Sequence, residues 1–325
     1  MFTKHRVVLC VSFLAIGAMS AAAQSKQPAE TRNAALRYWL AFGDLQDPPA
    51  DQATMDLLQK TAAGDAPWDE TKLGPILDKN EAAIWEMQRA TKLPECDWGL
   101  EYSQGWRASI AYAPKARVLA RLNTLYGMRL AARGDLGKAT DSWLAGIRFS
   151  QHLSQGGSLI FLLIAKTALL SHLNALNLAA RNASLPLAEK QRIETALRDL
   201  PETAYDWGGA LRLEEAAIEM FADELVRSPE PAKLYATVMG DEAAKTFSVP
   251  TAKDRAIFHQ LMLSAENALR QPPDAAREKL TQLQAQVNSL SQFFQQTTPS
   301  FTKQNEARAE IAATRAKLLQ ALMAK

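Results

Sequence analysis

The spacing of apolar residues constrains the fold of this chain more than any other feature of its sequence. Apolar side chains recur every three or four residues along most of its length, while strand-like alternation is nearly absent, which is the pattern of amphipathic helices. A proline ends a helix at little cost because it lacks the backbone N–H. The prolines between the periodic segments are Pro94, Pro114, Pro186, Pro201, Pro250, Pro272 and Pro273. The sequence therefore predicts an all-α fold.

About twelve helices are expected, arranged as an irregular stack of antiparallel hairpins. Their predicted ranges are 30–44, 51–62, 72–91, 115–132, 136–153, 158–181, 187–199, 209–227, 232–240, 251–270, 274–296 and 304–324.

The best local pattern is the stretch "GMRLAARGDLGKATDSWLAGI". Gly127 places a small residue on one helix, Gly134 begins a Gly-Asp turn, and Trp143 precedes Gly146 on the next helix. This resembles one hairpin of the tetratricopeptide class, in which small residues let paired helices approach closely. The resemblance covers residues 119–150, and no second copy follows at a period of about 34 residues. It implies a tetratricopeptide-like α-α superhelix without a regular repeat array.

A longer likeness covers residues 94–175, where a "P-x-C-x-W" segment, a long helix, the Gly-Asp turn and an apolar helix follow one another. This order resembles a loose group of uncharacterised secreted all-helical bacterial proteins. The resemblance implies a location in the bacterial envelope and supplies no catalytic residues.

The N-terminus reads as a secretory signal peptide. Lys4 and Arg6 give a positive start, Val7–Met19 is an apolar stretch, and Ala21–Ala23 supplies the small residues of a cleavage site. A retained anchor is the weaker alternative, because about 20 apolar residues are needed to span a bilayer. We therefore expect cleavage after residues 1–23 and export to the periplasm or the extracellular space.

Charge and cysteine content exclude several functions. Without Lys4 and Arg6, 35 basic residues remain against 35 acidic ones, and this balance does not favour nucleic-acid binding. Cys96 is then the single cysteine, and the flanking carboxylates of Glu95 and Asp97 oppose thiolate formation. We expect a quiet, partly buried thiol.

No cofactor or metal is expected. The remaining histidines, His152, His172 and His259, lie far apart in the sequence without a paired ligand motif. The sequence contains no GxSxG, phosphate loop or dinucleotide fingerprint.

The stretch from Ser158 to Ala180 is long and apolar enough to cross a membrane. However, Lys166, His172 and Asn174 fall inside it, and a central lysine costs about 3 kcal/mol on insertion. We expect a buried central helix, and no transmembrane segment after signal cleavage.

The C-terminal part has a distinct composition. A main helical domain over 24–272 is expected, followed by a helical hairpin over 273–325 that packs on it or serves as a dimerisation arm. Apolar residues with spacings of three and four form the seam of this hairpin; they are Leu280, Leu283, Val287, Leu290 and Phe294, faced by Ile311, Leu318 and Leu322.

Two similar segments, "LPECDWG" from residue 93 and "LPETAYDWG" from residue 200, raise the question of a binding site. In one interpretation, proline, aspartate and glycine end a helix and form a turn, while tryptophan covers the end of the core. In the other, two loops converge on a cleft whose aromatic faces and carboxylates bind glycan or peptide, or cleave it. The candidate binding residues are Asp97, Trp98, Tyr102, Trp106, Arg107, Asp206 and Trp207.

The sequence thus favours a non-enzymatic interaction or scaffold protein of the bacterial envelope, with an envelope protein as partner. The alternative is a protein that binds or cleaves glycan or peptidoglycan through the loops 94–112 and 200–208. Enzymatic activity is left open, and no catalytic residue is assigned.

Overall fold

Helices account for nearly all of the regular structure in this protein. The computed structural model describes residues 31–108, 110–182 and 185–323, so the predicted signal peptide lies outside the described residues. Within these ranges the chain has fifteen α-helices, thirteen of them with seven or more residues, and no strand. The all-α prediction is confirmed, with a helix count slightly above the expected twelve.

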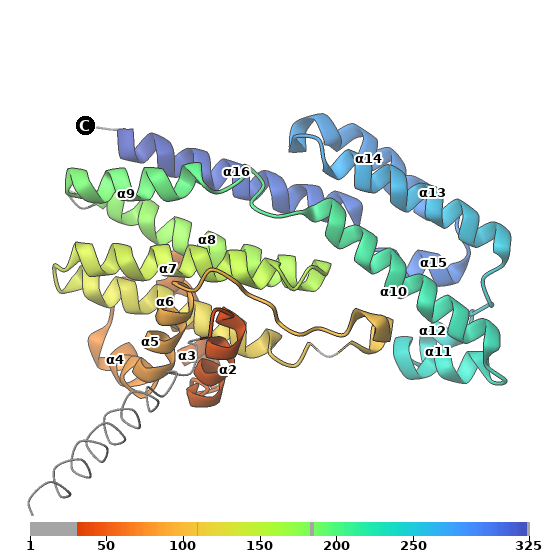
Figure 1. Ribbon diagram of the computed structural model, residues 1–325, viewed down its shortest axis with the longest axis horizontal. Coiled ribbons are helices and arrows are strands. Elements are labelled where there is room, and N and C mark those ends of the chain that lie inside the picture. Colours follow the sequence, from red (N-terminus) through yellow and green to blue (C-terminus); the bar gives the residue numbers. More distant parts are fainter. Residues whose placement is uncertain (1–30, 109, 183–184, 324–325) are drawn as a thin grey trace, which may run out of the picture. The chain divides into compact units, whose positions relative to one another are not determined.

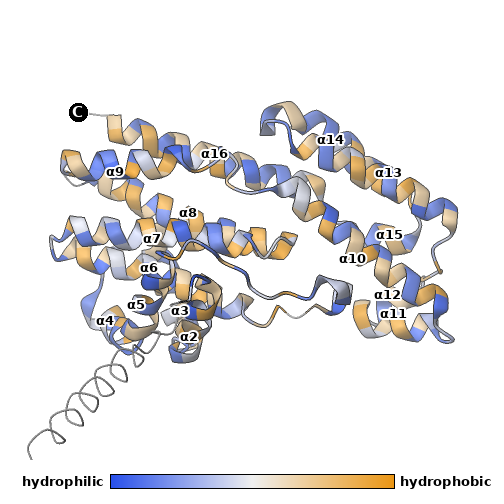
Figure 2. Cartoon of the chain, in the orientation of Figure 1, coloured by the Kyte–Doolittle hydropathy of each residue, from blue (hydrophilic) through white to orange (hydrophobic). Residues whose placement is uncertain are grey.

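The helices follow one another with short connections (Figure 1). Their bounds are α2 (Ala34–Asp44), α3 (Gln52–Ala63), α4 (Glu70–Lys79), α5 (Glu81–Ala90), α6 (Ala113–Ala132), α7 (Leu136–Ser154), α8 (Leu159–Asn182), α9 (Leu187–Arg198), α10 (Trp207–Arg227), α11 (Pro231–Met239), α12 (Asp241–Ala244), α13 (Ala252–Leu269), α14 (Pro273–Val287), α15 (Gln292–Thr297) and α16 (Phe301–Met323), with a short 3₁₀ helix η1 (Tyr102–Arg107) between α5 and α6. Figure 2 shows apolar and polar residues side by side on nearly every helix, as expected for helices that share a core.

Helices α6 and α7 form the hairpin that the sequence predicts. Gly134 adopts a positive φ of 83° in the turn, and Asp135 caps α7 by accepting the backbone N–H of Lys138. A Cβ at Gly127 would lie 2.3 Å from Nε1 of Trp143, and this indole donates a hydrogen bond to the carbonyl of Thr124. The small residue therefore permits the close approach of the two helices.

Helix α8 packs against α6, α7 and α16. It is the one described helix long and apolar enough to cross a membrane, and 61% of its most apolar window is buried within the protein. His172 is fully buried in it, and a Cβ at Gly146 of α7 would lie 2.0 Å from His172 Nε2. Lys166 forms an ion pair with Glu310 of α16. Most of the long apolar helix thus serves as core.

The described residues from Asn33 onward form one compact unit. Helix α10 lies beside α13, α13 beside α14, and α14 beside α16, which also packs on α8 (Figure 1). All eight residues of the predicted C-terminal seam and its facing stripe are buried. The predicted hairpin over 273–325 therefore belongs to the same unit as the helices before it.

The prediction of one continuous helix over 72–91 is wrong, because Asn80 separates α4 from α5. The Asn80 amide donates to the carbonyl of Ile76 and accepts the backbone N–H of Gln46. An asparagine that satisfies backbone groups with its own side chain competes with helix continuation.

A single helix over 274–296 is also wrong. Helix α14 ends at Val287, and after a turn the short helix α15 places Phe293 and Phe294 in an aromatic cluster. The ring of Phe294 stacks on Phe258 at 4.2 Å, and that of Phe293 lies 6.0 Å from Tyr235. Burial of two consecutive phenylalanines outweighs the helical preference of the connecting residues.

Candidate functional site

The segment of residues 93–112, which we call the aromatic arm, contains most of the predicted binding residues. Its start is fixed to α2: the carbonyl of Glu95 accepts the backbone N–H of Ala34 at 2.7 Å. The Asn33 side chain both donates to the carbonyl and accepts the N–H of Asp97, each at 2.8 Å. These bonds hold an irregular segment in one position.

Trp98 belongs to the core. Its side chain is 6% exposed, its ring stacks on Tyr112 at 4.3 Å and on Tyr38 at 5.4 Å, and its Nε1 donates to the carbonyl of His152 at 2.8 Å. Tyr112 stacks in turn on Phe161 of α8 at 4.9 Å. The Trp98 indole is thus almost fully covered by its neighbours and is not open to a sugar.

Tyr102 directs its hydroxyl toward the turn that precedes α8. A Cβ on Gly157 would lie 3.4 Å from this hydroxyl, and one on Gly156 would lie 3.1 Å from the hydroxyl of Tyr112. The Tyr112 hydroxyl is buried without a hydrogen-bond partner among the described residues, and the buried Tyr102 hydroxyl lies beside the backbone N–H of Ser158. Burial, and secondarily the carboxylate of Glu214, raises the pKa of Tyr102 to about 12. These hydroxyls stay protonated near neutral pH and cannot act there as bases.

The far end of the arm is fastened to α10. The ring of Trp106 lies 5.1 Å from that of Phe221, and its Nε1 donates to Glu224 at 3.2 Å. The guanidinium of Arg107 donates to the same carboxylate at 2.6 Å and lies over the Trp106 ring at 4.3 Å. Because of this ion pair, the pKa of the Glu224 carboxyl is lowered. Trp106 and Arg107 thus tie the arm to α10.

The aspartates of the two similar segments accept hydrogen bonds from backbone N–H groups. Asp97 accepts the N–H of Gly99 at 2.9 Å, while Asp206 caps α10 by accepting the N–H of Gly209 at 2.9 Å. Trp207, 1% exposed, donates its indole N–H to the carbonyl of Thr203. For the first segment this geometry agrees with a turn, in which Gly99 has a positive φ of 65°. For the second segment the expected turn at Gly208 is wrong, because Trp207 and Gly208 already belong to helix α10, which Asp206 caps.

The candidate residues therefore lie at three places in the fold. Trp98 and Tyr102 reach the α7–α8 turn, Trp106 and Arg107 reach the side of α10, and Trp207 lies at the start of α10. Within the described ranges, no ring contact joins Trp98 to Trp207. The contacts of the candidate residues thus lie on different parts of the fold.

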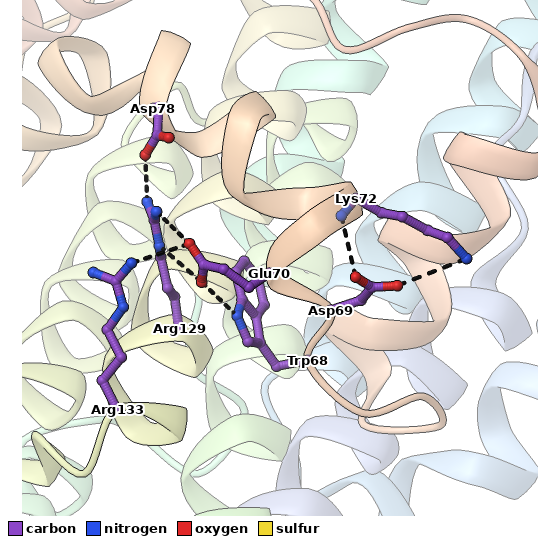
Figure 3. A network of polar contacts seen from close by, with 7 residues as sticks. All are labelled: Trp68, Asp69, Glu70, Lys72, Asp78, Arg129 and Arg133. Atoms are coloured by element: carbon purple, nitrogen blue, oxygen red, sulfur yellow. Dashed lines mark hydrogen bonds and ion pairs between the residues drawn. The ribbon is translucent and has the colours of Figure 1, made fainter.

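A polar network that the sequence does not reveal joins α4 to α6 (Figure 3). The Glu70 carboxylate accepts hydrogen bonds from Trp68 Nε1 at 2.9 Å, from Arg129 at 2.5 Å and from Arg133 at 3.0 Å. Arg129 also donates to Asp78 at 2.6 Å. The acidic and basic partners are more than fifty residues apart, so no local pattern marks them.

Trp68 lines an apolar hollow of about 220 Å³ together with Met128, Trp143 and Leu178. Pockets for drug-sized ligands usually measure about 300–1,000 Å³. The hollow is therefore too small to indicate an enclosed small-molecule site.

An exposed apolar face lies on the outer side of α2. Leu36, Trp39 and Leu40 are 56%, 44% and 60% exposed, at the spacings of three and four that place residues on one helix face. The Trp39 ring contacts Tyr112 edge-on at 5.4 Å, which attaches this face to the buried aromatic stack. We call these three residues the α2 face.

Ligand sets for metals are not evident. Throughout the described part of the chain, no cluster of three or more His, Cys, Asp or Glu residues could hold a metal ion. Cys96 is buried, and burial followed by the charge of Asp97 raises the pKa of its thiol to about 12. A thiol with this pKa is a poor nucleophile at neutral pH.

In comparisons with known proteins, no protein family, curated protein or solved structure matches this chain.

Proposed function

We propose that the protein is an exported, non-enzymatic interaction module of the bacterial envelope that binds a partner protein through the α2 face. The observation that carries the proposal is the exposure of Leu36, Trp39 and Leu40 on one side of a helix. A contiguous exposed apolar patch is typical of protein–protein contact sites, and tryptophan is enriched among the residues that dominate binding energy there.

The support beneath this face favours a binding role. Trp39 contacts Phe42 and Tyr112, and the C-terminal end of α2 is held by Lys115, whose ammonium donates to the carbonyl of Phe42 at 2.7 Å. Arg37 of the same helix forms an ion pair with Glu86 of α5. A rigid helix loses little conformational entropy when a partner binds, which raises affinity.

The alternative of glycan binding or cleavage receives less support from the geometry. The Trp98 and Trp207 rings are 6% and 1% exposed, so they offer no open stacking surface for a sugar. Asp97 and Asp206 accept hydrogen bonds from backbone N–H groups. These hydrogen bonds assign both carboxylates a role in a turn or a helix cap.

Site-specific photo-crosslinking tests the proposal. A photoreactive residue replaces Leu40 in the mature chain, which is expressed in its native envelope, and a second variant carries the same residue at Leu187. Leu187 is an isolated leucine on α9, 71% exposed, and serves as the matched control. We expect one stoichiometric protein adduct from position 40 and none from position 187.

The purified partner is then titrated against the wild type and against a Leu36→Ser, Leu40→Ser variant. If the α2 face is the centre of the interface, the loss of both leucines weakens binding about tenfold or more, whereas Leu187→Ser leaves the dissociation constant unchanged. A partner that binds the double variant as tightly as the wild type refutes the assignment of the α2 face. Crosslinking of cell-wall glycan instead of protein supports the alternative function.

A further inference from the structure

A buried arginine lies on α16, where this helix meets the end of α13 and the start of α14. Arg308 is 2% exposed and is among the largest fully buried side chains of the protein. Its Nη1 donates to Asn305 Oδ1 at 2.7 Å, and its Nη2 donates to the carbonyl of Gln271. Asn305 is itself held by the carbonyl of Pro273, to which it donates at 2.8 Å. The guanidinium is therefore fixed in place by neutral groups.

The charge of Arg308 has no acidic partner in contact. No carboxylate of the described residues forms an ion pair with it, and its Nε has no hydrogen-bond partner in the same set. A buried cation without an anion is costly, because the low-dielectric interior does not replace its hydration. Consistent with this cost, burial lowers the pKa of Arg308.

Gln304 adds a second set of unsatisfied atoms one helical turn earlier. It is 5% exposed, and neither its Nε2 nor its Oε1 has a hydrogen-bond partner among the described residues. Residues four apart lie on the same helix face, so Gln304 and Arg308 together present unused N–H donors. Buried polar groups are almost always hydrogen-bonded, and an exception at two neighbouring positions calls for an explanation.

Glu202 is the acidic residue whose charge acts on Arg308. It raises the pKa of Arg308, although by less than burial lowers it. Glu202 is exposed and lies in the segment between α9 and α10, which also contains Ala204 at a positive φ of 62°. The charge of Glu202 therefore acts on Arg308 without direct contact. The same negative charge would repel an anion that binds at Arg308.

We propose that Arg308 and Gln304 form a binding site for a small oxyanion, a carboxylate or a phosphate group. The guanidinium supplies the charge and its free Nε–H, and the Gln304 amide supplies a second N–H. Arginine suits this role because its planar donors match the geometry of carboxylate and phosphate oxygens.

Thermal unfolding and calorimetry of the full mature chain test this site. Phosphate and acetate are each titrated at constant ionic strength against chloride. A ligand that binds only the folded state raises the melting temperature with its concentration. We expect phosphate, acetate or both to raise the melting temperature above its value in chloride. The size of the two shifts shows whether the site prefers phosphate or carboxylate.

Three variants assign the effect to residues. Arg308→Met and Gln304→Leu each remove donors and weaken the anion about tenfold or more. Glu202→Gln removes the repelling charge and tightens binding severalfold, which a merely structural role of Glu202 would not do. Arg315→Met is the matched control: it removes another arginine of α16, one that donates to the carbonyl of Leu197, and leaves anion binding unchanged.

Two results overturn the proposal. One is the absence of any difference between the oxyanions and chloride in the wild type. The other concerns stability: Glu202→Gln and Arg308→Met destabilise the protein equally, and the double variant is no less stable than either single variant. That result identifies Glu202 as the internal partner of Arg308. Gln304→Leu keeps the test decisive if Arg308→Met fails to fold.

Discussion

Mild acid is expected to destabilise this protein through two buried histidines. His172 and His152 are both 0% exposed. Burial lowers the pKa of each to about 4, from an ordinary value of 6.5. For His152 the charge of Arg148 is a second, smaller cause. His172 Nε2 lies 3.0 Å from Asn123 Nδ2, and its Nδ1 lies 2.6 Å from the carbonyl of Ala168, which suits a neutral ring with its proton on Nδ1.

The sign and size of the effect follow from these pKa values. Between pH 6.5 and pH 4 the unfolded chain binds a proton at each histidine and the folded chain does not, so the free energy of unfolding falls as the pH falls. One pKa unit corresponds to about 1.36 kcal/mol, which gives a loss of about 3 kcal/mol per histidine over this window. The loss is complete near pH 4, and full stability is present above pH 6.5. Because domains are typically stable by about 5–15 kcal/mol, two such losses are large.

Urea unfolding followed by circular dichroism at pH 7.0 and at pH 4.5 measures this loss. His172→Gln is expected to be less stable than the wild type at pH 7, because the Asn123 and Ala168 contacts change. Between pH 7.0 and pH 4.5, however, it should lose about 2.5 kcal/mol less than the wild type, since the last part of the loss falls below pH 4.5. His259→Gln is the control, since His259 is 59% exposed. If the His172→Gln variant shows the same pH dependence as the wild type, or if His172 titrates near pH 6.5 by NMR, the reasoning is refuted.

Three further predictions concern packing, reactivity and the aromatic arm. Gly127→Ala is expected to destabilise the α6–α7 hairpin by about 1–3 kcal/mol, because the added Cβ would overlap Trp143; urea unfolding followed by tryptophan fluorescence measures this. Cys96 should resist iodoacetamide in the folded protein at pH 8 and react once unfolded, as mass spectrometry can show, because its thiol is buried with a pKa of about 12. Glu224→Gln breaks the ion pair with Arg107 and should speed limited proteolysis of the arm; an unchanged cleavage rate would show that this pair does not hold it.

Much of the helical architecture could be predicted from the sequence, because the information is local. The Gly-Asp turn at 134–135 and the small residue Gly127 opposite Trp143 were visible as spacing, and both have the expected geometry. The sequence pattern does not predict the helix breaks at Asn80 and after Val287. The first depends on a bond to the distant Gln46, and the second on an aromatic cluster assembled from several helices.

The roles of the arm residues could not be derived from local patterns. Trp106 and Arg107 are aromatic and charged residues in a loop, a combination typical of binding sites. Their partner Glu224 lies more than a hundred residues away. Only the structure shows that the arm connects two parts of the fold: its start is bonded to α2, and Trp106 and Arg107 are bonded to α10.

Hydrogen bonding distinguishes three conspicuous side chains of the aromatic arm from two inconspicuous side chains of α16. The indoles of Trp98 and Trp106 and the guanidinium of Arg107 all have partners inside the chain. By contrast, Gln304 and Arg308 carry buried polar atoms without partners among the described residues, in a helix whose sequence attracts no notice. Since an unsatisfied buried donor costs free energy, a chain that retains two of them side by side gains most when an external acceptor reaches them. Trp98, Trp106 and Arg107 therefore tie the arm to the rest of the fold, and the donors of Gln304 and Arg308 are the ones that we propose an anion satisfies.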